Sequence, residues 1–184
     1  MVKWIVSVIF FFFGISFLPA QIDSAQGHYL YKPESFSPPI QALIKQFEGF
    51  PSIPMEAPDI EGKTHRIGGY RGKVTLMFFW KATPGRGDQL FQQFNAIAEK
   101  YPKKVKILSL ADEPKKEVVN FLQAQPIKFP VIANAKMLSE AVYGSDLGYP
   151  RIFVIDEFGI IKLVLPEVVL SKDINLENML ALFL

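Results

Sequence analysis

The sequence of 184 residues contains no cysteine. This absence excludes disulfide bonds, thiolate nucleophiles, thiol redox cycling and metal sites with cysteine ligands. Histidine is scarce as well, since only His28 and His65 occur and they lie far apart in the chain. A histidine metal site or Ser-His catalysis is therefore not expected. We predict no metal and no cofactor, and the sequence indicates no catalytic residue.

The sequence also lacks motifs that bind phosphate groups, metal ions or nucleic acid. No glycine-rich phosphate loop and no acidic metal-binding loop occurs at the required spacing. The net charge is only +2. The lysines gather in two short groups that are typical of solvated helix ends, Lys103, Lys104 and Lys106 in one and Lys115 and Lys116 in the other. Nucleic acid is therefore not an expected partner.

Apolar residues are abundant. They make up 49% of the chain, and 17 residues are phenylalanine. This composition is typical of a packed globular core and argues against disorder. The length predicts one domain with additional segments.

The N-terminus has the pattern of an export signal. Lys3 precedes an apolar run from Trp4 to Leu18, which is shorter than the about 20 residues of a membrane-spanning helix. Small-residue cleavage positions follow at Ala20 and Ala25. We predict a signal peptide within residues 1–25 and a periplasmic or secreted protein. The alternative is an uncleaved anchor, which would be the only contact with a membrane.

A proline-rich stretch follows over residues 26–54. We expect it to be an irregular extension that packs on the domain or tethers it. Apolar spacing within it predicts a short amphipathic helix over Ile40–Phe50.

Residues 55–184 carry the regular patterns of one domain. A hairpin with Gly62 in its turn is followed by alternating buried strands and amphipathic helices, and then by two strands around an "EFG" turn. A last helix is expected over residues 173–184, capped by Ser171 or Asp173. This order predicts an α/β fold with a mixed central β-sheet, helices on both faces and an N-terminal β-hairpin.

The residues of this region resemble a known fold family. The segments that carry the resemblance are "APDIEG", "GGYRGKVTLMFFW", "ILSLADEPKKEVVNFL" and "IKFPVIANAKMLSEAVYGSDLGYPRIFVIDEFGII". In this order they resemble the thioredoxin-like fold, and more narrowly the exported TlpA/ResA-like thiol-disulfide oxidoreductases of the redoxin superfamily. "KATPGRG" also resembles the cysteine motif of some peroxiredoxins, the AhpC/TSA-like proteins. The resemblance covers Ala57–Leu184.

The sequence differs from the family at the redox motif. The resemblance places the Cys-X-X-Cys at Pro84 and Gly87, and the peroxiredoxin register places the reactive cysteine at Arg86. A buried polar position of the family, two residues before Trp80, is Phe78 here. Proline, glycine and arginine cannot cycle between dithiol and disulfide, so the resemblance implies a family member without thiol chemistry.

Binding features of the family remain in the sequence. Pro150 matches the family's cis-proline, which faces the helix N-terminus and helps to hold extended peptides. The resemblance therefore implies a binding groove, whose candidate residues are Trp80, Thr83, Pro84, Arg86, Tyr149 and Pro150. Each also has an ordinary structural explanation: a core tryptophan, a helix cap, a solvated arginine or a proline that shapes a strand.

Three functions remain open from the sequence. The first is a non-catalytic binding module for an exported protein or an extended peptide. The second is a redoxin-type oxidoreductase or antioxidant role in cell redox homeostasis, exerted through a partner thiol protein. The third is a structural component of the cell envelope. The absence of cysteine favours the first.

Overall fold

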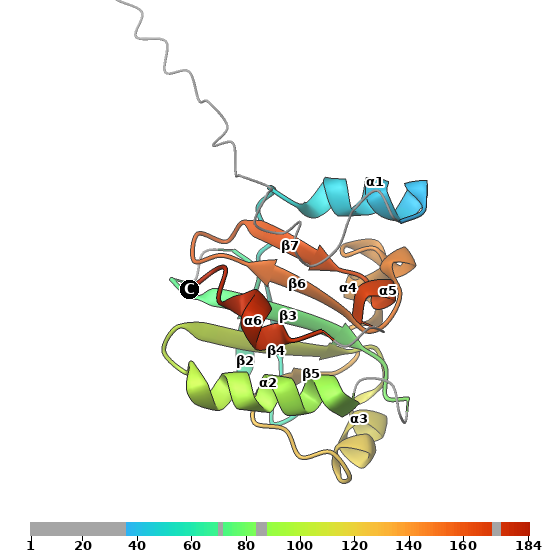
Figure 1. Ribbon diagram of the computed structural model, residues 1–184. Coiled ribbons are helices and arrows are strands. Elements are labelled where there is room, and N and C mark those ends of the chain that lie inside the picture. The colour runs from blue at the N-terminus through green and yellow to red at the C-terminus, as the bar shows by residue number, and fades with distance from the viewer. Residues whose placement is uncertain (1–35, 70–71, 84–87, 171–173) are drawn as a thin grey trace, which may run out of the picture.

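The computed structural model describes residues 36–69, 72–83, 88–170 and 174–184 (Figure 1). The predicted signal peptide, its cleavage positions and the first part of the proline-rich stretch lie outside these residues. Within the described ranges, no helix is both long enough and apolar enough to cross a membrane.

The core of the molecule is a five-stranded mixed sheet with the strand order β5-β4-β3-β6-β7. The central strand β3 (Val74–Trp80) pairs in parallel with β4 (Val105–Ala111), which pairs in parallel with β5 (Val131–Ile132). On its other side β3 pairs antiparallel with β6 (Arg151–Ile155), and β6 pairs antiparallel with β7 (Ile161–Leu165).

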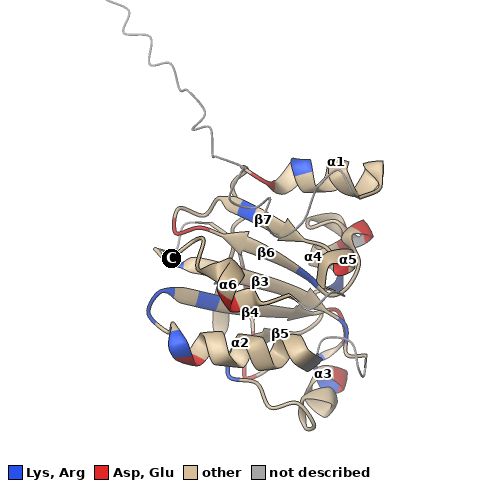
Figure 2. Ribbon diagram, viewed as in Figure 1, with Lys and Arg blue, Asp and Glu red and all other residues tan. Residues whose placement is uncertain are grey.

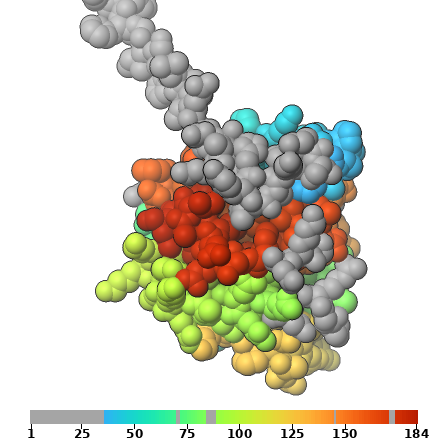
Figure 3. Space-filling view, viewed as in Figure 1, coloured from blue at the N-terminus to red at the C-terminus, as the bar shows by residue number. Residues whose placement is uncertain are grey.

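Helices cover both faces of this sheet, so every residue of β3 is buried. One face packs against α2 (Asp88–Lys100), α3 (Lys115–Leu122) and α6 (Leu176–Leu180). The other face packs against α1 (Pro38–Phe47) and α4 (Lys136–Ala141). Figure 2 shows that β3 carries no charged residue, and Figure 3 shows α6 seated against α2.

Short elements complete the fold. The hairpin of β1 (Met55–Pro58) and β2 (Thr64–Ile67) forms a separate two-stranded sheet. The 3-10 helix η3 (Ser145–Leu147) precedes β6, and α5 (Glu167–Leu170) follows β7. The predicted thioredoxin-like α/β fold, with a mixed sheet, helices on both faces and an N-terminal β-hairpin, is confirmed.

The chain after β7 differs from the sequence prediction. The final helix was expected over residues 173–184 with Ser171 or Asp173 as its cap. Instead α6 begins at Leu176, and Asn175 caps it by accepting a hydrogen bond from the N–H of Asn178 at 2.9 Å. Helix α5 was not predicted, because its apolar residues continue the pattern of β7. Pro166 separates the two elements, since proline ends a strand and favours the first turn of a helix.

Candidate functional site

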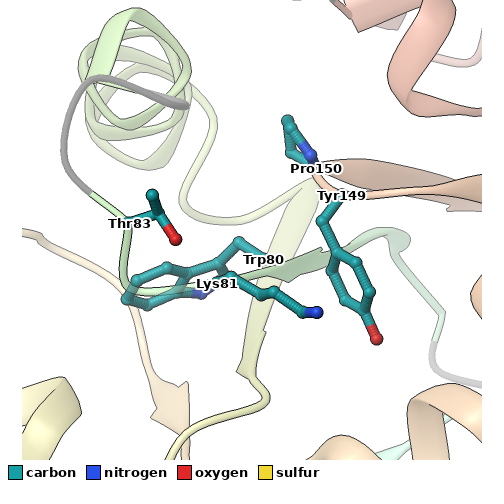
Figure 4. Close-up of a pocket in the computed structure, with 5 residues that line it drawn as sticks. All are labelled: Trp80, Lys81, Thr83, Tyr149 and Pro150. Carbon is teal, nitrogen blue, oxygen red and sulfur yellow. The ribbon is translucent and has the colours of Figure 1, made fainter.

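A pocket of about 220 Å³ opens at the carboxyl end of β3, and Figure 4 shows the residues that line it. They come from two segments of the chain: Trp80 at the end of β3 with Lys81 and Thr83 just after it, and Tyr149 and Pro150 just before β6. These segments meet because β3 and β6 are antiparallel neighbours, with Phe79 paired to Arg151. The register of two central strands therefore places the pocket.

Trp80 forms a fixed wall of this pocket. Its side chain is only 2% exposed, and its indole Nε1–H donates to the Ser109 hydroxyl at 2.5 Å. The ring also packs edge-on against Phe91 at a centroid distance of 5.0 Å, and it packs in a tilted arrangement against Phe121 at 5.3 Å. The indole is therefore a core group with one edge at the pocket, and partner binding would not need to reorient it.

The opposite wall is Tyr149 and Pro150, which are joined by a cis peptide bond. Within the described part of the chain, neither the N–H nor the C=O of Tyr149 forms a backbone hydrogen bond. These groups are thus available to an extended segment placed beside them. The Tyr149 hydroxyl hydrogen-bonds the Ser139 hydroxyl. Burial raises the pKa of Tyr149 above its ordinary value, so the phenol stays neutral at physiological pH.

Arg151 lies beneath the pocket and is fully buried, although it was not predicted as a site residue. Its guanidinium donates to the carbonyl oxygens of Gly148 at 2.9 Å and Ser139 at 3.0 Å, and to the Ser139 hydroxyl at 2.6 Å. Its Cζ lies 4.7 Å from the centroid of the Phe79 ring and 4.4 Å from that of Tyr149. Burial lowers the pKa of Arg151 from its ordinary value, but an arginine remains charged in proteins. The available signal was a cation opening the apolar strand "RIFVI".

Lys81 contributes the charge at the pocket itself. Its ammonium lies 4.6 Å from the centroid of the Tyr149 ring, and Figure 4 shows the side chain directed toward that ring. The side chain is exposed, and no ion pair of Lys81 occurs among the described residues. Tyr149 therefore contacts two cations, the buried Arg151 and the exposed Lys81.

Two acidic residues before α3, Asp112 and Glu113, lie next to the chain that lines the pocket. Glu113 accepts a hydrogen bond from the N–H of Ala82 at 3.0 Å, so it braces the backbone after β3. Asp112 is only 9% exposed, and its Oδ1 has no hydrogen-bond partner among the described residues. Its negative charge favours the charged form of Arg151. From the sequence alone, both residues were interpreted as acids at the start of a helix. In the structure, Glu113 hydrogen-bonds the backbone beside the pocket, and Asp112 interacts electrostatically with Arg151.

Four of the predicted groove residues, Trp80, Thr83, Tyr149 and Pro150, thus meet at one pocket. Pro84 and Gly87, which the resemblance places at the Cys-X-X-Cys positions, and Arg86 of the alternative register lie outside the described residues. Phe78 is fully buried among Phe91 and Phe94, which is a core environment and not a proton relay.

The described lining of the pocket is mainly aromatic and apolar. Among the described residues it holds no carboxylate or imidazole, and the sequence contains no cysteine. In the described ranges, no group of three or more potential metal ligands is present. Aromatic walls, free backbone groups and one ammonium can hold a chain segment but offer no nucleophile or general base of ordinary strength.

Comparison with known sequences agrees with the fold. Residues 49–164 match the AhpC/TSA family. The thiol-disulfide oxidoreductase ResA of Geobacillus thermodenitrificans (strain NG80-2) is 29% identical over 119 residues, which cover 64% of this chain and 68% of ResA. ResA of Geobacillus kaustophilus (strain HTA426) is 27% identical over 120 residues, with the same coverage of both chains.

Solved structures show the same architecture. A thiol:disulfide interchange protein of the thioredoxin family from Chlorobium tepidum TLS aligns with a TM-score of 0.58 and 17% identity, covering 72% of this chain and 94% of that one. The exposed lipoprotein thioredoxin of Streptococcus pneumoniae strain TIGR4 aligns with a TM-score of 0.56 and 20% identity, covering 71% and 98%. At these identities the likeness concerns the fold alone.

Proposed function

The chain belongs to the AhpC/TSA family, and we propose that it is a non-catalytic binding module that holds an extended segment of an exported protein. The observation that carries this proposal is the pocket beside the cis Tyr149–Pro150 bond, where the N–H and C=O of Tyr149 form no backbone hydrogen bond with any described residue. An extended segment that lies there can form main-chain hydrogen bonds, while its side chain enters between Trp80 and Tyr149.

The missing cysteine separates this chain from the chemistry named for its relatives. ResA is a thiol-disulfide oxidoreductase, and such a reaction needs a thiolate that attacks a disulfide. This chain contains no sulfur that can do so. A redox or antioxidant role would therefore require the thiol of a partner protein, and it is the second candidate. A structural role in the envelope is the third, and no feature of the pocket supports it.

The place of action follows from the predicted leader. A signal peptide within residues 1–25 would deliver the domain to the periplasm or the exterior, and retention of that segment would leave it anchored. Either outcome makes exported proteins or peptides the available partners.

The direct test is photocrosslinking in cells with a photoreactive residue at Thr83, which is exposed and lines the pocket. The matched control places the same residue at Asn178, an exposed position of α6. We expect one recurrent exported protein, crosslinked through a single short segment, from Thr83 and not from Asn178. The same captured protein at both positions, or none at Thr83, would refute a binding role for the pocket.

A second measurement separates the binding and redox functions. Insulin reduction and peroxide consumption by the purified full-length chain should equal the protein-free rate, because no thiol is present. Turnover that follows the protein concentration in a thiol-free preparation would contradict the non-catalytic function.

A further inference from the structure

Lys81 is the charged residue among those that line the pocket, and its ammonium has no counter-ion within the described ranges. In Figure 4 its side chain extends between Trp80 and Tyr149, with the nitrogen directed toward the Tyr149 ring. An ammonium is a compact, strongly hydrated charge with three donors, and it pairs well with a carboxylate. The pocket thus has one recognition group of defined sign.

The acids near Lys81 have other roles. The Glu113 carboxylate accepts the N–H of Ala82, and Asp112 is almost fully buried, where its charge acts on Arg151. The buried negative charge of Asp112 is thus offset by the buried positive charge of Arg151. Among the described residues, the charge that remains without a counter-ion at the pocket is the ammonium of Lys81.

The position of Lys81 is also stabilised by its contact with Tyr149, which in turn contacts Arg151. Its ammonium lies over the Tyr149 ring, and that ring is held by the Ser139 hydroxyl and by the guanidinium of Arg151. Arg151 is in turn packed against Phe79 and hydrogen-bonded to Gly148. A cation positioned in advance loses less side-chain entropy when it binds. A series of cation–ring contacts therefore connects the core to the proposed partner surface, running from Phe79 through Arg151 and Tyr149 to Lys81.

We propose that the pocket selects an extended segment in which an acidic side chain pairs with Lys81 and a neighbouring apolar side chain enters the pocket beside Trp80 and Pro150. This inference rests on the proposed function, because it names the partner's chemistry at the same pocket. A basic residue at that place would face the ammonium of Lys81, so like-charge repulsion weakens its binding.

The test uses the full-length chain and three blocked, fluorescein-labelled peptides that differ in one residue. All share Gly-Ser flanks and a central Leu, which is followed by Glu, Gln or Lys. Fluorescence anisotropy should show the Leu-Glu peptide binding about two- to fivefold more tightly than the Leu-Gln peptide, as for an exposed ion pair. The Leu-Lys peptide should bind most weakly, and added salt should reduce the difference.

Substitutions at Lys81 assign the preference to one residue. Lys81→Gln should abolish the difference between the Glu and Gln peptides, and Lys81→Glu should reverse it in favour of the Lys peptide. Lys103→Gln is the matched control, since it removes an equal charge from an exposed position distant from the pocket. Thermal unfolding verifies that each variant is folded.

The outcomes separate the inference from the proposed function. Equal affinity for the three peptides, with NMR shifts at Thr83 and Tyr149, would overturn the acidic preference and leave peptide binding in place. An equal loss of preference in Lys103→Gln would overturn the assignment to Lys81. If no peptide shifts the signals of Thr83 or Tyr149, both the inference and the binding function fail.

Discussion

At the scale of single residues, Arg151 is the least expected feature of the molecule. It is a fully buried cation without a salt bridge among the described residues, held by two carbonyl oxygens, a hydroxyl and two aromatic rings. A buried charge costs several kcal/mol unless such partners compensate it. Because those partners include Gly148 and Tyr149, Arg151 positions the segment that forms one wall of the pocket.

The first prediction concerns Arg151→Leu. The change leaves the carbonyl oxygens of Ser139 and Gly148 without their donor and removes the positive charge near Asp112. Urea unfolding should show a loss of about 2–4 kcal/mol in the free energy of unfolding. The same chemical change at exposed Arg66 should cost less than about 0.5 kcal/mol. Similar losses in both variants would argue against a structural role for Arg151.

The second prediction concerns Tyr143 and alkaline pH. Burial raises the pKa of Tyr143 to about 12, against about 10 in an unfolded chain. The unfolded state therefore loses its proton first, so the resulting stability is complete below pH 10 and is lost as the pH rises toward 12. The decline amounts to at most about 1.4 kcal/mol per pH unit.

Tyr143→Phe removes this titration and little else, because within the described residues the hydroxyl makes just one hydrogen bond, a long one of 3.4 Å to the carbonyl oxygen of Ile53. Urea unfolding of both proteins at pH 8 and at pH 11 should show a shallower decline in the variant. Burial also raises the pKa of Tyr149, so some decline should persist. An unchanged decline in Tyr143→Phe would show that this phenol does not couple to folding.

At the scale of elements, the chain before the hairpin is part of the packed structure. Helix α1 buries Ile44, and Phe47 packs edge-on against Phe153 at a centroid distance of 5.2 Å. The residues after α1 run along the edge strand β7, where Gly49 N–H donates to the Ile161 carbonyl at 2.8 Å and Ile161 N–H donates to that of Phe50 at 2.9 Å. The segment thus covers an edge that would otherwise expose unpaired backbone groups.

The third prediction tests this docking. Ile44→Ala should reduce the free energy of unfolding by about 2–4 kcal/mol, because it leaves a cavity beneath α1. Gln46→Ala, at an exposed position of the same helix, should change it by less than about 0.5 kcal/mol. Equal effects, measured by urea unfolding, would mean that α1 does not pack on the sheet in solution.

At the scale of the whole molecule, the chain has a thioredoxin-like fold and contains no cysteine. It belongs to the AhpC/TSA family, and its sheet has the mixed arrangement that the sequence predicted. The alignment of the family's cysteine positions with Pro84 and Gly87, or with Arg86, stays a prediction, because these residues lie outside the described ones.

The fourth prediction restores two thiols. In Pro84→Cys combined with Gly87→Cys, mild oxidation should close an intramolecular disulfide, as in the family's motif. Alkylation followed by mass spectrometry should find no reactive thiol after oxidation and two after reduction. The single Pro84→Cys variant is the control and should remain alkylatable in the monomer. Two thiols that stay reactive under oxidation would show that the register, and not the fold, is misassigned.

Much of this molecule follows from its sequence alone. The absence of cysteine determined the loss of thiol chemistry, since no tertiary contact can supply a missing sulfur. The order of strands and helices was also readable, because burial imposes a local period on each element. The cap of α6 was misplaced because Ser171, Asp173 and Asn175 are all good capping residues in sequence, and only the packed helix selects among them.

Tertiary structure alone decided how the pocket is built. Lys81, Asp112, Ser139 and Arg151 lie in separate segments, and none follows a local pattern that points to the others. Lys81, Asp112 and Arg151 meet because the register of β3 with β4 and β6 brings the ends of these strands together. Ser139 comes from α4 and joins them through its hydrogen bonds with Arg151. Register depends on how whole strands pack, which no short stretch of sequence encodes. The sequence therefore determined that thiol chemistry is impossible. The packing of the sheet determined which side chains and backbone groups face a partner at the pocket.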